Sequence, residues 1–197
     1  AMAITSAIMV PTSQFIIRDY IGTTQGFDQA GYWQGVWYIS TTYLMIVTTA
    51  LSTYYLPRLS EITSKQELRK EILQGYKILL PIVIVCGLII YLLRDFIIYL
   101  LFSDSFTPMK PLFTWQIIGD VFKIASWLLA YVMLAKAMTR IFIISEIFFS
   151  VTFVLLSYFF IKSEGTIGVT YAYCLNYFLY MIVFIFVINK YSSENLK

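Results

Sequence analysis

The sequence contains no histidine, and this absence removes several kinds of chemistry. Catalytic arrangements that use an imidazole as the general base, such as Ser-His-Asp and Cys-His, are excluded, as are most zinc sites. Only two cysteines occur, Cys86 and Cys174, and each lies within an apolar run. We therefore interpret them as small apolar core residues rather than as a disulfide or a metal site.

Charge is also scarce, because only 13% of the 197 residues are charged while 59% are hydrophobic. A soluble domain carries roughly 25% charged residues, which it needs to coat its surface. This composition therefore predicts an integral membrane protein. The net charge is only +3 and the chain has no block of lysine and arginine, so no nucleic-acid partner is expected.

Charged residues divide the chain into apolar stretches, and a helix needs about 20 apolar residues to cross a membrane. The stretches do not alternate between polar and apolar residues, which favours helices over strands. We predict an all-α polytopic membrane protein in which residues 1–197 form a single six-helix transmembrane lobe. The six predicted spans are approximately 1–18, 30–56, 76–93, 112–135, 140–161 and 168–189. Two further segments are a predicted cytoplasmic amphipathic connector at 58–75 and a periplasmic interfacial segment at 94–110.

The loops between these spans differ in basic residues, and membrane proteins keep an excess of lysine and arginine on the cytoplasmic side. One side carries nine, namely Arg58, Lys65, Arg69, Lys70, Lys77, Lys136, Arg140, Lys190 and Lys197. The other side carries four, namely Arg18, Arg94, Lys110 and Lys162. The first side is therefore predicted to be cytoplasmic, together with the C-terminus. The first span has no cytoplasmic flank before it, so we expect the chain to be the C-terminal part of a longer protein.

Three charged residues fall inside predicted spans, where charge is costly and usually faces a protein interior or a wet cavity. Asp120 and Lys123 are three residues apart and share a helix face. They form either a self-neutralising pair or the lining of a cavity in which Lys123 meets an anionic substrate. Glu146 is either a structural partner of Lys136 or Lys123, or a group that takes a coupling proton or cation.

Other candidates lie near the predicted membrane interfaces. Lys136 and Arg140 flank the tight turn between two spans, and Arg18 lies near the outer end of the first. Each is either a topology anchor or a contact for a phosphate group, which arginine binds in a bidentate manner. Two Trp-Gln pairs are either interface anchors or sugar contacts, since an indole face beside an amide suits a sugar. The pairs are Trp33 with Gln34 and Trp115 with Gln116.

An ordered set of short motifs carries a family resemblance along nearly the whole chain. The motifs are GYWQGV at 31–36, YLPRLS at 55–60, LLRDF at 92–96, FTWQIIGDVFK at 113–123 and AKA at 135–137, followed by Arg140 and Glu146. Together they resemble the Wzx-type O-antigen flippases, close to the branch that contains the enterobacterial common antigen flippase. The resemblance is to the C-terminal half of that family only, and it puts activity of this half alone in doubt.

The resemblance implies a fold and a function. Members of the family have twelve spans in two six-helix lobes, a fold shared with multidrug and toxic compound extrusion transporters of the MOP superfamily. They move an undecaprenyl-pyrophosphate-linked oligosaccharide from the cytoplasmic to the periplasmic leaflet of the Gram-negative inner membrane, in lipopolysaccharide biosynthesis.

The implied partners are that lipid-linked substrate, the bilayer and an N-terminal six-helix lobe, together with an O-antigen polymerase and a chain-length regulator. No cofactor is implied beyond a coupling proton or sodium ion, for which Glu146 and Asp120 are candidates. The substrate cavity would use Lys123, with Arg18 and Arg58 near its ends.

Rival functions remain beside this one. A membrane-bound polymerase would usually carry large outer loops, and a membrane acyltransferase typically needs a histidine. Both are therefore disfavoured, and we predict that the chain is not an enzyme. A MATE-fold exporter of another lipid-linked glycan or of a small solute fits the composition equally well. An inactive half-transporter fragment is the last alternative.

Overall fold

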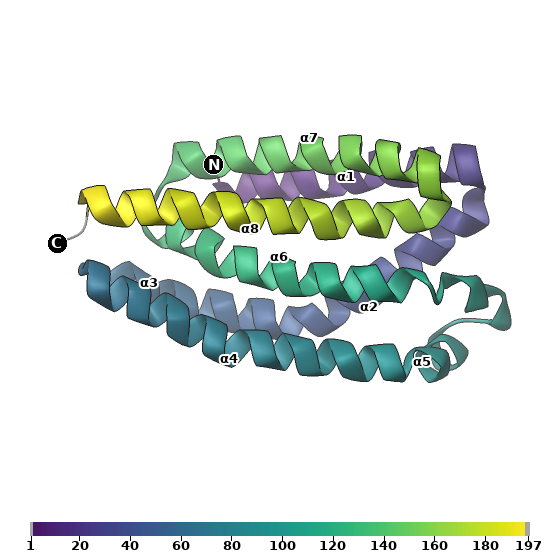
Figure 1. The fold of residues 1–197 in the computed structure, drawn as a ribbon, viewed down its shortest axis with the longest axis horizontal. Coiled ribbons are helices and arrows are strands. Elements are labelled where there is room, and N and C mark those ends of the chain that lie inside the picture. Colours follow the sequence, from purple (N-terminus) through teal and green to yellow (C-terminus); the bar gives the residue numbers. More distant parts are fainter. Residues whose placement is uncertain (1, 196–197) are drawn as a thin grey trace.

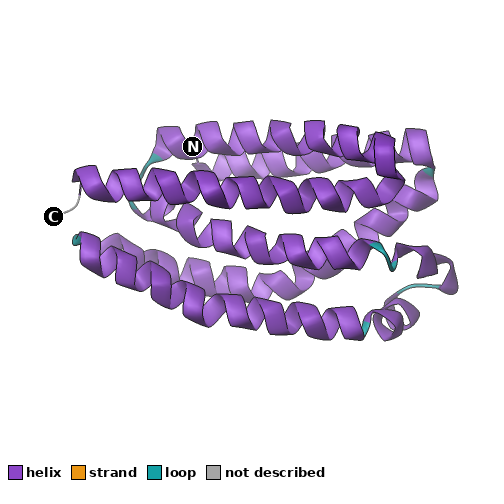
Figure 2. Cartoon of the chain, in the orientation of Figure 1, coloured by secondary structure: helices purple, strands orange, loops and turns teal. Residues whose placement is uncertain are grey.

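The computed structural model describes residues 2–195, and within this range the chain consists of helices and short connections without strands (Figures 1 and 2). Within the described residues, six long helices lie side by side along the long axis of the molecule (Figure 1). They are α1 (Met2–Gln25), α2 (Phe27–Ala50), α4 (Lys65–Leu92), α6 (Leu112–Ala135), α7 (Thr139–Glu164) and α8 (Gly168–Asn195). The shorter elements are η1 (Leu51–Tyr55), α3 (Leu56–Glu61), α5 (Arg94–Leu101), η2 (Asp104–Met109) and η3 (Gly165–Ile167).

Three stretches of the described chain are long and apolar enough to cross a membrane: α4, α6 and Thr139–Ser193. The third stretch holds two antiparallel helices, α7 and α8 (Figure 1), because the chain turns at Gly165, whose positive φ of 70° suits glycine. Helices α1 and α2 have 24 residues each, about 36 Å at 1.5 Å per residue. They are long enough to span but more polar, so spans at 1–18 and 30–56 remain predictions.

The segment predicted as a separate connector, 58–75, is divided in the structure between two helices. Its first residues belong to α3, residues 62–64 connect, and the remainder is the beginning of α4. The backbone becomes extended at Ile62 and Ser64. Residues 65–74 contain no glycine or proline, and α4 continues past them through Gly75 and Pro81, so the charged segment and the apolar one form a single helix. The predicted outer segment 94–110 contains α5 and η2.

Helix α6 occupies the centre of the bundle and is the most buried of the apolar stretches. It packs most extensively against α8, and it also contacts α4, α2, α3 and α7. Two groups of buried side chains surround it. One group includes Leu51, Leu59 and Leu68, near the end of the bundle where α3 meets α4. The other includes Ile17, Trp33 and Tyr173, toward the opposite end.

Candidate functional site

A cavity of about 390 Å³ lies between five helices, α1, α2, α6, α7 and α8. Aromatic side chains form much of its wall, and short polar side chains of α1 complete it. Its charged lining residues are Lys123 and Glu146. The full lining is Ser6, Val10, Ser13, Gln14, Trp37, Thr41, Lys123, Trp127, Ala130, Tyr131, Leu134, Phe142, Glu146, Phe149, Ser150, Phe153, Asn176, Tyr177 and Tyr180. The sequence predicted both charges at membrane depth, and the structure brings them to one cavity.

Lys123 lies on the buried face of α6 with only 6% of its surface exposed. Its ammonium group faces aromatic rings from three helices. The distances from Nζ to the ring centroids are 5.0 Å for Trp127, 5.3 Å for Trp37, 5.8 Å for Tyr177 and 5.9 Å for Tyr173. Rings at such distances attract a cation through the negative potential of their faces. Within the described chain, no carboxylate oxygen lies within 4 Å of this ammonium.

Asp120 is fully buried, one helix turn from Lys123, and does not line the cavity. Three hydroxyl groups donate hydrogen bonds to its carboxylate. Ser40 Oγ lies 2.6 Å from Oδ1, Tyr173 OH lies 2.8 Å from Oδ1, and Tyr43 OH lies 2.8 Å from Oδ2. The contact ion pair that the spacing of Asp120 and Lys123 allows is therefore not formed, because hydroxyl groups of α2 and α8 occupy the carboxylate instead.

Glu146 is half-buried on the wall of the cavity and joins three helices. Ser6 Oγ of α1 donates to its Oε2 at 3.0 Å, and Tyr180 OH of α8 donates to its Oε1 at 2.6 Å. The described chain shows no ion pair of Glu146 with Lys136 or Lys123. The structural partnership considered from the sequence is thus replaced by bonds to hydroxyl groups.

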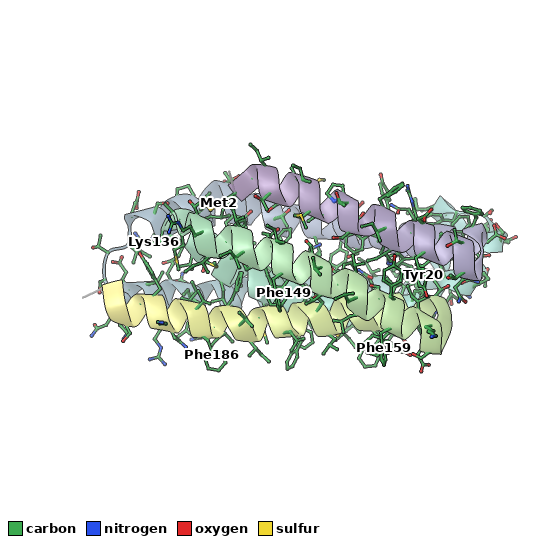
Figure 3. The ribbon with its side chains drawn as sticks, turned by 90° about the horizontal axis from the view of Figure 1, so that it is seen from above. Met2, Tyr20, Lys136, Phe149, Phe159 and Phe186 are labelled. Carbon is green, nitrogen blue, oxygen red and sulfur yellow. The ribbon has the colours of Figure 1, made fainter. Side chains whose placement is uncertain are left out.

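The basic residues near the predicted cytoplasmic end lie outside the cavity. Figure 3 shows Lys136 at the turn before α7, at a distance along the helices from Phe149, which lines the cavity. Lys136 Nζ donates a hydrogen bond to the carbonyl oxygen of Ile62, and burial lowers the pKa of this ammonium. Arg140 is exposed on the first turn of α7.

Arg58 lies at the same end and is held by an ion-pair network. Its guanidinium lies 3.7 Å from Glu61, 2.9 Å from Glu67 and 3.5 Å from Glu71. Since Glu61 belongs to α3 and the other two carboxylates to α4, the network joins the two helices. These contacts favour a structural role for Arg58 over a direct phosphate contact.

Arg18 belongs to a second hollow, of about 350 Å³, formed by the last turns of α1 and the first turns of α2. Its lining is Phe15, Arg18, Asp19, Phe27, Ala30, Gly31 and Gln34. The guanidinium carbon of Arg18 lies 5.9 Å from the centroid of the Phe15 ring. The structure therefore brings Arg18 and Gln34 together, away from Lys123.

The two Trp-Gln pairs are separated by the fold and form no common sugar platform. Trp33 is 1% exposed, and its Nε1 has no hydrogen-bond partner, while its neighbour Gln34 lines the second hollow. Trp115 is 41% exposed and packs edge-on against Tyr171. Gln116 is buried and donates from Nε2 to Ser40 Oγ at 3.3 Å, beside Asp120.

The contribution of α8 to this site was not predicted from the sequence. Tyr173, Tyr177 and Tyr180 follow the spacing i, i+4, i+7, which places them on one face of a helix. All three contact a charged residue of the site, Tyr173 and Tyr177 facing Lys123 and Tyr180 donating to Glu146. This tyrosine spacing is the sequence feature from which the role of α8 could have been predicted. In the described residues, no group of three His, Cys, Asp or Glu side chains is placed to hold a metal ion.

Comparison with known proteins relates the chain to flippases. It is 35% identical over 179 residues to the Lipid III flippase of Escherichia coli (strain K12), a match that covers 91% of this chain and 43% of the relative. The Lipid III flippase of Shigella flexneri gives the same values. The chain thus spans less than half the length of these relatives. No protein-family model and no solved structure matches it.

Both relatives are named flippases, which are transporters rather than enzymes, and the predicted absence of enzymatic activity is confirmed on that basis. The resemblance to flippases of lipid-linked glycans is supported at that general level, whereas neither name mentions O-antigen.

Proposed function

We propose that the chain forms one six-helix lobe of a flippase in the bacterial inner membrane. Its substrate is an oligosaccharide linked through pyrophosphate to undecaprenol, an O-antigen repeat unit, which moves from the cytoplasmic to the periplasmic leaflet. The C-terminus is cytoplasmic, and an N-terminal lobe completes the path. The similarity to two lipid flippases supports this class of substrate.

The observation that carries the proposal is the free ammonium group of Lys123 in the cavity. A pyrophosphate that crosses about 30 Å of hydrocarbon needs compensating positive charge on its way. Lys123 lines the cavity, and no carboxylate of the described residues contacts it, so its charge is available to an anion. Aromatic rings around it offer faces for sugar rings, while the lipid tail stays in the bilayer.

Glu146 is the proposed coupling residue. Its carboxylate lines the same cavity and is bound by hydroxyl groups of α1 and α8. A proton or sodium ion that binds it would change the contacts that join α1, α7 and α8. A unit charge moved across the membrane is worth about 2.3 kcal/mol per 100 mV, which can drive the rocking of one lobe against another.

The test is Lys123→Ala in the chain joined to its N-terminal lobe, in a strain that lacks its own O-antigen flippase. We expect surface O-antigen to be lost while the protein still inserts in the membrane, because the pyrophosphate loses its counter-charge. Lys123→Arg, which keeps the charge, is the matched control and should retain part of the activity. Normal O-antigen with Lys123→Ala would refute the role of this residue.

A second candidate function, transport of a different lipid-linked glycan, is favoured by the names of the relatives. The two candidate functions are distinguished by expressing the chain in two strains. One strain lacks its own lipid III flippase, and the other lacks its own O-antigen flippase. Rescue of the first strain alone would replace the O-antigen assignment. The chain should be tested both with and without an N-terminal lobe, and rescue by the chain alone would show that the second lobe is dispensable.

A further inference from the structure

We propose that Asp120 is a positioning residue, whose carboxylate holds the aromatic rings that face Lys123 in place. This inference rests on the proposed function, in which the Lys123 ammonium binds the substrate pyrophosphate. The sequence placed Asp120 among the cavity and coupling candidates. The structure places it behind the cavity wall, fully buried, where substrate in the cavity does not touch it.

The hydrogen bonds to Asp120 all run in one direction. A carboxylate only accepts, so each hydroxyl group bound to it must donate. Ser40 and Tyr43 donate from α2, and Tyr173 donates from α8. The carboxylate of α6 therefore fixes two neighbouring helices against its own, and the hydroxyl rotors have one orientation.

Tyr173 lies between the two charges and contacts both Asp120 and Lys123. Its hydroxyl group lies 2.8 Å from Asp120 Oδ1, and its ring centroid lies 5.9 Å from Lys123 Nζ. The ring also packs edge-on against Trp37 at 5.4 Å and against Tyr177 at 4.9 Å, and both of these rings face the same ammonium. Fixing one hydroxyl group thus fixes a connected set of rings.

Asp120 also holds α2 through Ser40. Ser40 follows Trp37 by three residues, which is about one helical turn. The hydrogen bond from Ser40 Oγ to Asp120, at 2.6 Å, therefore fixes the position of α2 along α6, and with it the position of the Trp37 ring relative to Lys123. Gln116 of α6 also donates a hydrogen bond from Nε2 to Ser40 Oγ, at 3.3 Å. Ser40 is therefore bound to α6 through two residues, Asp120 and Gln116.

This arrangement keeps Lys123 available. A carboxylate in contact with the ammonium would compete with a phosphate for the same charge. Asp120 is instead held by hydroxyl groups, while the ammonium is surrounded by rings whose cation–π attraction is weaker than a charged contact. Asp120 thus orients the site without occupying it.

The test measures binding of inorganic pyrophosphate to the whole chain in nanodiscs, read from the fluorescence of the tryptophans beside Lys123. Tyr173→Phe keeps the ring and removes the donor, and we expect about two- to fivefold weaker binding. Asp120→Asn should weaken it by about five- to tenfold, because an amide cannot accept all three donors. Thr170→Val is the matched control on α8, since Thr170 is a buried hydroxyl that bonds Ile167 and not Asp120, and it should leave binding unchanged.

Combined variants separate this inference from the proposed function. Lys123→Met should abolish pyrophosphate binding, and adding Tyr173→Phe to it should then have no further effect. If Lys123→Met binds normally, the proposed function itself is wrong. If Lys123→Met fails to bind while Tyr173→Phe matches Thr170→Val, only the positioning role of Asp120 is overturned. Tyr173→Phe decides the question even if Asp120→Asn does not fold.

Discussion

At the scale of the residue, the buried charges are stabilised without contacting one another. Asp120 accepts from three hydroxyl groups, Glu146 accepts from two, and Lys123 faces aromatic rings. A buried charge without partners costs several kcal/mol, so each needs such compensation. Hydroxyl groups and rings provide it, and the rings leave the Lys123 ammonium open to a ligand in the cavity, which a contact ion pair would hinder.

Backbone strain at one residue can be tested by substitution. Ala137 has a φ of 51° in the turn between α6 and α7, a region that disfavours residues with a Cβ. Ala137→Gly should raise the free energy of unfolding by about 0.5–1 kcal/mol, the relief of strain less the entropy of glycine in the unfolded chain. Thermal unfolding in detergent measures this. Ala135→Gly, at the helical end of α6, should instead lower stability, and equal effects would contradict the assignment to strain.

At the scale of the element, the site depends on how closely α6 approaches α8. Gly119 of α6 faces Tyr173 and Cys174 of α8. A Cβ at Gly119 would lie 2.4 Å from Tyr173 Cδ1 and 3.2 Å from the Cα of Cys174. Any larger residue would push apart the helices that hold Asp120 and Tyr173 in contact.

Gly119→Ala should therefore destabilise the protein by about 1–3 kcal/mol, the usual cost of inserting volume into a packed core. Gly31→Ala on α2 is the control, because a Cβ there meets nothing within 4 Å. That control should leave stability unchanged or raise it by up to about 1 kcal/mol through helix propensity. The measurement is the unfolding midpoint of each variant. Similar midpoints for Gly119→Ala and Gly31→Ala would argue against close packing at Gly119.

The outer segment gives a prediction with a pH dependence. Lys110 Nζ lies 2.7 Å from Asp95 Oδ1, and this hydrogen bond lowers the pKa of the Asp95 carboxyl below its ordinary value. The pair joins the first turn of α5 to the residue that follows η2. A carboxyl with a lowered folded-state pKa stabilises the fold above its unfolded pKa and loses that effect as the pH falls through the folded value.

Lys110→Met should thus lower the unfolding midpoint slightly at neutral pH, and this difference should shrink as the pH falls through the lowered folded-state pKa of Asp95. Lys162→Met, which removes a lysine at the end of α7, is the control for a general charge effect. A difference for Lys110→Met that persists unchanged at low pH would show that the pair is not its cause.

At the scale of the whole molecule, the helices give the bundle two ends of different character. The turn at Lys136 and the junction of α3 with α4 lie at one end, and α5 with η2 lies at the other (Figure 1). Among the described residues, the basic side chains predicted to be cytoplasmic gather at the first end, in agreement with the direction inferred from their number, while Lys197 lies outside the described residues. The orientation itself remains a prediction.

Reporter fusions test that orientation. A fluorescent protein fused after Lys190 should fluoresce, because it folds in the cytoplasm, while an alkaline phosphatase fused after Ser105 should be active in the periplasm. The same reporters exchanged between the two positions are the controls and should both be inactive. The reverse pattern would invert the proposed direction of the lobe.

The sequence by itself determined that this is a membrane protein. Its charged residues are too few to cover a water-exposed surface, and its apolar runs are long enough to cross a bilayer. It also located the three charges that fall inside predicted spans, since a charge within an apolar run is visible without a structure. The extent of α4 was less predictable, because charged and apolar residues share one unbroken helix there.

The tertiary structure decided which partners those charges have. Helical spacing shows which residues share a face, but it does not show which other helix that face meets. Ser40 bonds Asp120 across 80 residues of sequence, and Ser6 bonds Glu146 across 140. Asp120 and Lys123, three residues apart, were the obvious pair by spacing, yet packing of α2 and α8 against α6 supplied other partners and left the lysine open to the cavity.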